Sequence, residues 1–197
     1  MSYLLWIIVG LIALFALWAI GTFNTLIRLR NQVQNGWSQI DVQLQRRYDL
    51  IPNLVESVKG YMKHERETLN AVVTARNQAV QAKKALQEAG GPTQASLKNL
   101  LEAEGALKGP MMQLFALAEN YPQLRASENM QQLQEELATT ENKVAFSRQA
   151  YNDNVLYYNN FQQQFPANLL ATTFGHHSAE FFEIDSSEAK KAVKVTF

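Results

Sequence analysis

The histidines of this chain come nearest, by type and spacing, to a metal site. His64 and Glu65 begin an HExxH motif, in which two histidines one helical turn apart bind zinc and the glutamate acts as a general base. Thr68 stands where the second histidine must lie, so the motif lacks a ligand. His176 and His177 are adjacent, and neighbouring side chains diverge on a helix or a strand. The sequence therefore predicts no metal site.

Other catalytic motifs are also missing from the sequence. The Gly90-Gly91-Pro92 turn lacks the lysine and hydroxyl of a phosphate-binding loop, and no Gly-x-Ser-x-Gly motif occurs. The chain has no cysteine, which excludes disulfides, thiolate catalysis and cysteine-bound metals. An acid–base site could be formed by Asp41, Asp49 and Asn53. However, Asp49 suits a helix cap equally well, and Asn53 suits a position in the first turn of a helix. We therefore expect a non-enzymatic protein without a cofactor.

Six charged residues stand where the helical pattern predicts apolar ones: Arg47, Glu65, Arg76, Glu104, Glu141 and Arg148. A buried charge needs a partner. Counted along antiparallel helices from the Gly90-Gly91 turn, Arg76, Glu104 and Glu141 fall at nearly the same level. We therefore expect a structural polar network in which Arg76 lies within ionic reach of Glu104 or Glu141. The alternative is that these charges lie in water at the edges of the apolar stripes.

The N-terminal segment is long and apolar enough to span a bilayer. The first 27 residues carry no charged side chain, and a helix from Tyr3 to Ile20 is ~27 Å long, or ~37 Å if it continues to Ile27, against a hydrocarbon core of ~30 Å. A cleaved signal peptide has a basic start and a shorter apolar stretch, although Ala19-Ile20-Gly21 resembles a weak cleavage site. We expect residues 1–27 to be retained as a transmembrane anchor.

The charge distribution predicts the orientation of this anchor. Arg28, Arg30, Arg46 and Arg47 follow the span, and only the α-amine precedes it. Because positive charge favours the cytoplasmic side, we expect the N-terminus outside and the C-terminal domain in the cytoplasm. Overall, 18 basic residues balance 18 acidic ones, so there is no basic field to hold nucleic acid.

Helices must position nearly all of these residues. Apolar residues recur every three or four positions over residues 26–44, 51–80, 97–121 and 133–165, which gives each helix one buried face. Gly90 to Thr93 separates the second stretch from the third, and Tyr121-Pro122 with Ser127 separates the third from the fourth. The predicted fold is all-α: the transmembrane helix, an antiparallel four-helix bundle over residues 28–165, and a short C-terminal extension over residues 166–197.

The boundary between the first two stretches has two interpretations. Asp49 can cap a new helix with Pro52 in its first turn, where a missing amide hydrogen costs nothing, and this predicts a turn near Tyr48. However, the apolar stripe crosses Pro52 in phase, so one kinked helix from the membrane to residue 88 is the alternative. We favour the turn. Gly109-Pro110 is likewise expected to bend or interrupt the third helix.

Amides and aromatic residues indicate possible contact surfaces. The chain has 18 Gln and 15 Asn but only 18% charged residues, and amides can pair across packed helices without burying a charge; a solvated polar face is the alternative. Tyr157 and Tyr158 point about 100° apart on a helix, so one of them should face a second surface. The candidate subunit interface comprises Tyr157, Tyr158 and Phe161, and packing against the C-terminal segment is the alternative.

The segment 166–197 is too apolar to be a free linker. It holds Leu169, Leu170, Phe174, Phe181 and Phe182, and we expect it to pack on the bundle, the membrane or a neighbouring subunit. Its last residues, Val193 to Phe197, alternate like a short strand that a peptide-binding domain can capture.

Several motifs of this chain strongly resemble those of the bacterial LemA family. They are Trp37 to Leu44 (WSQIDVQL), Arg46 to Val55 (RRYDLIPNLV), Lys59 to Glu65 (KGYMKHE), Glu119 to Ala126 (ENYPQLRA), Thr140 to Asn142, Arg148 to Asn152 (RQAYN) and Phe165-Pro166. The resemblance runs from the anchor to about Phe182. It implies a single-span protein of the bacterial inner membrane with a cytoplasmic helical bundle and no established enzymatic activity. The family that the chain resembles includes proteins needed for magnetosome membrane formation. Its genes often lie beside those of membrane metalloproteases.

These observations lead to three hypotheses of function. The first is a membrane-anchored scaffold that binds lipid, self-associates as a homo-oligomer, and organises or shapes the membrane or its proteins. The second is an adaptor or regulator of a membrane-bound protease, such as a metalloprotease, with the bundle or the terminus Val195-Thr196-Phe197 as the contact. The third is an enzyme with an unrecognised site.

Overall fold

The computed structural model describes residues 2–62 and 64–183, and most of these residues are helical. The helices are α1 (Ser2–Lys59), α2 (Arg66–Glu88), α3 (Gln94–Ala118), α4 (Pro122–Arg125), α5 (Glu128–Gln163) and α6 (Ala167–Thr173). Within the described ranges there is no strand, which confirms the all-α prediction. The expected strand at 193–197 lies outside these ranges.

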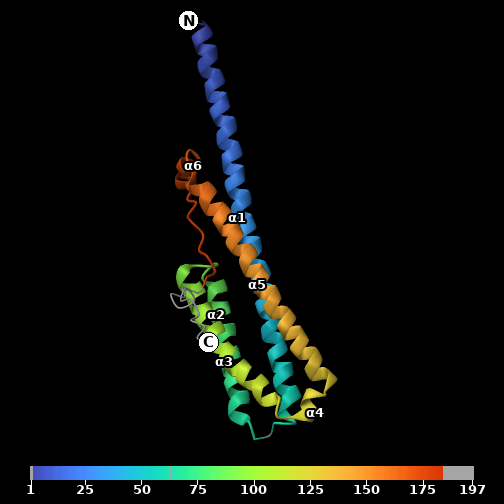
Figure 1. Cartoon of the computed structure of the whole chain (residues 1–197). Helices are drawn as coiled ribbons and strands as arrows, with labels where there is room; N and C mark the ends of the chain where they lie inside the picture. The colour runs from blue at the N-terminus through green and yellow to red at the C-terminus, as the bar shows by residue number, and fades with distance from the viewer. Residues whose placement is uncertain (1, 63, 184–197) are drawn as a thin grey trace, which may run out of the picture.

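Two helix pairs make up the domain (Figure 1). The first pair is α1 with α5, which runs antiparallel to it along much of its length. The second pair is the α2–α3 hairpin, which packs against the half of α1 farther from the N-terminus. α6 follows α5 and contacts α1 near the point where α1 leaves the domain. A regular four-helix bundle stays a prediction, as do the domain limits 1–27, 28–165 and 166–197.

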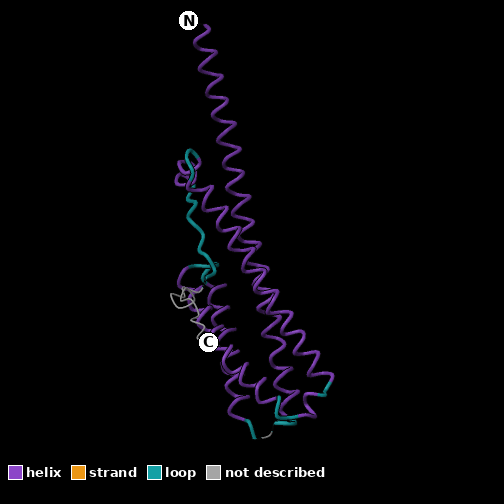
Figure 2. The backbone as a smooth tube through the Cα atoms, in the orientation of Figure 1, coloured by secondary structure: helices purple, strands orange, loops and turns teal. Residues whose placement is uncertain are grey.

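An extended segment follows α6 and turns back along α5 (Figure 2). It contains residues 176–182, whose backbone is hydrogen-bonded to side chains of α5. The described part of the C-terminal segment therefore packs on the helical domain.

α1 is one continuous helix that contains Pro52, so the predicted turn near Tyr48 is wrong. Its apolar stripe stays in phase across the proline, and Leu44, Ile51 and Val55 are all buried. Asp49 therefore caps no helix. The third helix, α3, also runs on through Pro110 without the interruption that we considered.

The N-terminal part of α1 projects beyond the rest of the domain (Figure 1). An 18-residue window of this part has a mean hydropathy of 2.6 and buries none of its residues. The same helix enters the core at Leu26, which is fully buried. A long apolar surface without protein cover fits a hydrocarbon environment, as the predicted anchor requires.

The turn between α2 and α3 forms as predicted. Gly90 and Gly91 have φ angles of 82° and 130°, in the region that glycine adopts most readily. Thr93 then caps α3: its hydroxyl accepts a hydrogen bond from the amide of Ser96, and the Ser96 hydroxyl accepts one from the amide of Thr93. This capping box fixes where α3 begins.

α1 and α5 approach closely at Gly36. A β-carbon there would lie 3.1 Å from Nδ2 of Asn154 and 3.3 Å from Cα of Tyr151. Gly105 of α3 is the matched case, since nothing lies within 4 Å of a β-carbon at that position. The absence of a side chain at Gly36 therefore lets the two backbones pack together.

We predict that Gly105→Ala stabilises the protein by about 0.5–1 kcal/mol, because glycine weakens a helix interior by that amount. Gly36→Ala should give no such gain, because α1 and α5 must move apart. Denaturant unfolding of the full-length chain in detergent, followed by circular dichroism, measures both variants. Equal gains from the two variants would contradict the close approach.

Candidate functional site

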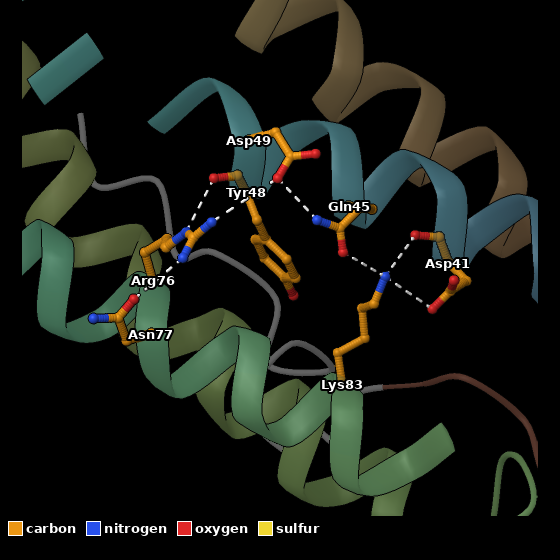
Figure 3. A network of polar contacts seen from close by, with 7 residues as sticks. All are labelled: Asp41, Gln45, Tyr48, Asp49, Arg76, Asn77 and Lys83. Carbon is orange, nitrogen blue, oxygen red and sulfur yellow. Dashed lines mark hydrogen bonds and ion pairs between the residues drawn. The ribbon is translucent and has the colours of Figure 1, made fainter. Parts of the chain in front are cut away.

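A row of polar contacts joins α1 to α2, and we call it the α1–α2 seam (Figure 3). On α1 the participants recur every three or four positions, so they share one helix face. Their partners on α2 are two cations that are seven residues apart and an amide that lies eleven residues after the first cation. The residues are Asp41, Gln45, Tyr48 and Asp49 of α1, and Arg76, Lys83 and Gln87 of α2.

Lys83 is the buried cation of the seam, with a side chain only 7% exposed. Its Nζ lies 3.1 Å from Oδ1 of Asp41 and donates to the Asp41 carbonyl and to Oε1 of Gln45 at 3.3 and 3.0 Å. Gln87 donates to the same Asp41 carboxylate at 3.0 Å. The three oxygens around Nζ satisfy the ammonium, as a buried charge requires.

Arg76 supplies the hydrogen bond that Pro52 removes from α1. Proline has no amide hydrogen, so the carbonyl of residue 48, four positions earlier, loses its helical donor. The Nε of Arg76 donates to this Tyr48 carbonyl at 3.0 Å. Nη2 of Arg76 also lies 3.9 Å from Oδ1 of Asp49. In α3 the corresponding carbonyl is that of Ala106, four residues before Pro110, and Ala106 is exposed to water.

Arg47 connects α1 to both α3 and α5. Its Nη1 lies 2.9 Å from a carboxylate oxygen of Glu104 and 2.9 Å from one of Glu141. The Arg47 and Glu104 side chains are only 13% and 14% exposed. The Tyr48 hydroxyl donates to the other oxygen of Glu104. One guanidinium therefore ties three helices together close to Pro52.

The expected pairing of Arg76 with Glu104 or Glu141 is wrong. Arg47 occupies that position because α1 continues past Tyr48 and presents Arg47 between α3 and α5. Arg76 instead faces Tyr48 and Asp49.

The other charged residues of the expected network lie elsewhere. Arg148 lies over the ring of Phe182, with 5.9 Å from its Cζ to the ring centroid, a cation–π distance. Glu65 precedes α2 without a side-chain cap bond. Its place in a shared polar network stays a prediction.

Tyr48 keeps its proton because of this environment. Burial, followed by the Glu104 carboxylate next to it, raises the pKa of the Tyr48 hydroxyl well above its usual range. The folded protein therefore holds this hydroxyl as a neutral donor to Glu104, which suits a structural contact and not a general base.

The amides of α5 bind the extended C-terminal segment. Asn159 donates to the carbonyl of Ala179 at 2.9 Å and accepts from its amide at 2.8 Å. Asn152 makes the same two contacts with Phe182, at 3.3 and 2.8 Å. Each side-chain amide thus pairs with one residue of backbone as a neighbouring strand would. The amide-rich composition serves this segment at these two positions.

His176 lies at the start of the same segment and is buried. Its Nδ1 lies 3.1 Å from the hydroxyl of Tyr158, and its carbonyl accepts from Gln162 at 3.1 Å. Burial, and then the positive charge of Arg30, lower the pKa of His176. A neutral His176 hydrogen-bonded to Tyr158 anchors the segment to α5.

The three candidate interface residues have different surroundings. Tyr158 is buried and Tyr157 is 64% exposed, so the two adjacent rings do face different surfaces. Phe161 is half-buried against the core. A subunit contact through any of them stays a prediction.

Within residues 2–62 and 64–183, no group of three or more His, Asp or Glu side chains is placed to hold a metal ion. His64 is exposed. The charged groups around Arg47 and Lys83 are engaged with one another, so the arrangement can hold helices together more readily than it can act on a substrate.

The comparison with known proteins now decides the family. The sequence model of the LemA family matches residues 36–197. The chain belongs to the LemA family. This confirms the resemblance found in the motifs, and those motifs include Asp41, Arg47, Tyr48 and Pro52 of the contacts described above.

The relatives of this LemA-family chain carry two different names. Magnetosome protein MamQ 2 of Paramagnetospirillum magneticum is 26% identical over 82% of the chain, and magnetosome protein MamQ of Magnetospirillum gryphiswaldense is 24% identical over 81% of it. The chain spans 64% of the length of each. Protein LemA of Metamycoplasma hominis is 24% identical over 86% of the chain and 72% of its own length. None of these names states an enzymatic activity.

Sequence reasoning missed Lys83, although a signal for it exists. Val72, Ala79 and Leu86 form a buried stripe on α2, and Lys83 falls in phase with it. A cation on that stripe predicts an acidic partner on a facing helix. The partner, Asp41, is not identifiable without knowing that α1 passes this point.

We predict a coupling between Arg76 and Pro52. Arg76→Met should destabilise the protein by about 1–3 kcal/mol, because it leaves the Tyr48 carbonyl without a donor. In a Pro52→Ala background the restored amide of residue 52 can bond to that carbonyl, so the same substitution should cost about 1 kcal/mol less. Denaturant unfolding of the four chains measures the difference.

Pro110→Ala is the matched control, because the carbonyl it restores is that of exposed Ala106. The cost of Arg76→Met should be unchanged in that background. An equal cost in all three backgrounds would show that Arg76 does not replace the missing hydrogen bond.

We also predict a pH dependence that Tyr48 carries. Its pKa is raised in the folded state, whereas an unfolded tyrosine titrates near pH 10. Above that pH the unfolded chain binds fewer protons than the folded one, so stability falls as pH rises, by up to about 1.4 kcal/mol per pH unit for one group. Tyr48→Phe removes this contribution. The gap in unfolding free energy between wild type and Tyr48→Phe should be constant near pH 8 and should narrow above pH 10; a constant gap throughout contradicts the prediction.

Proposed function

We propose that this membrane-associated helical protein is a scaffold that holds its helical domain in a fixed orientation at a bacterial inner membrane and self-associates there. The observation that carries the proposal is the continuity of α1. One helix contains both the exposed apolar N-terminal segment and the buried stripe of the domain. A continuous helix gives such a scaffold a direct connection between the span and the domain.

The physical consequence of this continuity is stiffness. α1 has 58 residues, which corresponds to a rod of ~87 Å. With no loop between span and domain, the domain follows the tilt of the span instead of moving freely on a linker. Arg47 and the α1–α2 seam fasten the other long helices to this rod.

An exposed aromatic strip on α5, made of Phe146 and Tyr157, supports self-association. Phe146 and Tyr157 are 72% and 64% exposed. They are eleven residues apart, which is close to three full helical turns, so they lie on the same face of α5. Exposed aromatic side chains of this kind are enriched at protein interfaces. Tyr158 and Phe161 are engaged inside the protein and support the packing of α5 instead.

Further support comes from charge and from the relatives. Arg28 and Arg30, both exposed, follow the apolar segment, and a basic flank favours the cytoplasmic side. This distribution supports the proposal of a cytoplasmic domain. The likeness to proteins named for the magnetosome agrees with a role in organising a membrane.

The two other hypotheses have less support. An adaptor that uses Val195-Thr196-Phe197 to bind a membrane metalloprotease depends on residues outside the described ranges. An enzyme would need a reactive group free of the structural contacts in which Asp41 takes part. Both stay predictions.

We predict that Phe146→Ser with Tyr157→Ser lowers the oligomeric mass of the full-length chain in mild detergent. The wild-type chain should be larger than a monomer at micromolar concentration, and the double variant should shift towards the monomer because its α5 strip no longer carries the two aromatic rings. Light scattering coupled to size-exclusion chromatography measures the protein mass. Met112→Ser is the control, because Met112 is 63% exposed on α3 and its loss should leave the mass unchanged. A monomeric wild type defeats the scaffold proposal, and an oligomer that the double variant leaves intact rules out the strip.

A further inference from the structure

The corner where α5 passes into α6 has apolar side chains that stay largely exposed. Phe165, Leu169 and Phe174 are 80%, 61% and 57% exposed; we call these three residues the α6 corner. The sequence around them has no Asp, Glu, Lys or Arg between Asp153 and Glu180. Such an uncharged, apolar surface has little reason to face bulk water.

The register of α5 on α1 gives the level of this corner. Glu136 of α5 lies 3.7 Å from Arg46, and Asn154 donates to the carbonyl of Gln32 at 3.3 Å. Continued along the antiparallel pair, the end of α5 comes level with Phe23. The ring of Phe174 does lie against the ring of Phe23, with 4.9 Å between centroids, and α6 contacts α1 here (Figure 1).

The same level is the expected edge of the bilayer. From Tyr3, where the apolar surface begins, Phe23 lies ~30 Å along the helix, which is the thickness of a hydrocarbon core. Arg28 and Arg30 are exposed and lie ~8 to 10 Å farther along α1, where headgroups and water begin. The α6 corner therefore lies beside the last turns of the span and not below them.

We propose that Phe165, Leu169 and Phe174 insert into the interfacial zone of the bilayer that α1 spans, so that the chain meets the membrane at two points. This inference rests on the proposed membrane anchoring. Aromatic and leucine side chains favour the boundary between headgroups and acyl chains. Because α6 lies on one side of α1, its insertion gives the domain a second contact with the leaflet, beside the span. This second contact limits rotation of the domain about α1.

Lipid explains the position of this surface better than a second protein copy does. The apolar surface of the corner is continuous, through the Phe23–Phe174 contact, with the apolar surface of α1. The exposed strip on α5 that we propose for self-association begins at Phe146, before the uncharged region, and has the charged Asp153 between its two aromatic residues, Phe146 and Tyr157. The corner is thus an extension of the membrane-facing surface of the chain.

The absence of cysteine from the chain allows a direct test with one environment-sensitive fluorophore at a time. Three full-length variants, Leu11→Cys, Leu169→Cys and Met112→Cys, are labelled with a nitrobenzoxadiazole probe and reconstituted into phosphatidylcholine vesicles. The acyl chains carry bromine, a contact quencher, either near the headgroup or deep in the core. Leu169 and Met112 are matched, with exposures of 61% and 63%.

The probe at Leu169 should be quenched several-fold more than the probe at Met112, and more by shallow bromine than by deep bromine. The probe at Leu11 should be strongly quenched by both lipids, which reports the span itself. Quenching at Leu11 with none at Leu169 overturns the inference and leaves the anchor intact. No quenching at Leu11 overturns the anchor and the inference together. A blue-shifted but unquenched probe at Leu169, which reverts when protein is diluted in lipid, means that a second copy covers the corner and also overturns the inference.

Discussion

The hydrogen bond from Arg76 to the Tyr48 carbonyl compensates for the break that Pro52 makes in α1. A proline inside a helix removes one hydrogen bond and crowds the carbonyl four residues earlier, at a cost of about 3 kcal/mol. Because Arg76 replaces the lost donor, α1 continues and its apolar stripe stays in phase from Leu26 to Val58. The span, the core and the contacts of α1 with its neighbours all depend on that continuity.

The charged side chains around α1 determine which helices lie beside it. Asp41 of α1 pairs with Lys83 of α2, and Arg47 of α1 pairs with Glu104 of α3 and Glu141 of α5. A buried ion pair adds little net stability over apolar packing, but a buried charge without a partner strongly destabilises the fold. We therefore attribute to them the choice of register and neighbour, while the apolar stripes supply most of the stability. The result is a rod, α1, to which both α5 and the α2–α3 hairpin are attached.

Local signals predicted much of this structure, and non-local ones were missed. The helical stripes, the Gly90-Gly91 turn and the apolar N-terminal segment depend on nearby residues and were predicted correctly. The turn near Tyr48 was wrong because the donor that rescues Pro52 comes from Arg76, on another helix. Asn152 and Asn159 lie seven residues apart on one face of α5, but nothing near them in the sequence shows that their partner is extended backbone, so this pairing could not be predicted. The predicted pairing of Arg76 with Glu104 or Glu141 was wrong for a related reason. Counting residues from a turn gives the height of a residue along its helix, but not the direction in which its side chain points.

The central claim is that one rigid helix carries the membrane span into the domain core, past Pro52. Its most direct test is the distance between two spin labels on α1, at cysteines replacing exposed Asn24 and Glu56, in the full-length chain reconstituted in lipid. These positions are 32 residues apart, so double electron–electron resonance should give a single narrow distribution of distances centred at ~48 Å. A broad distribution, or a second population at shorter distance, would contradict the account.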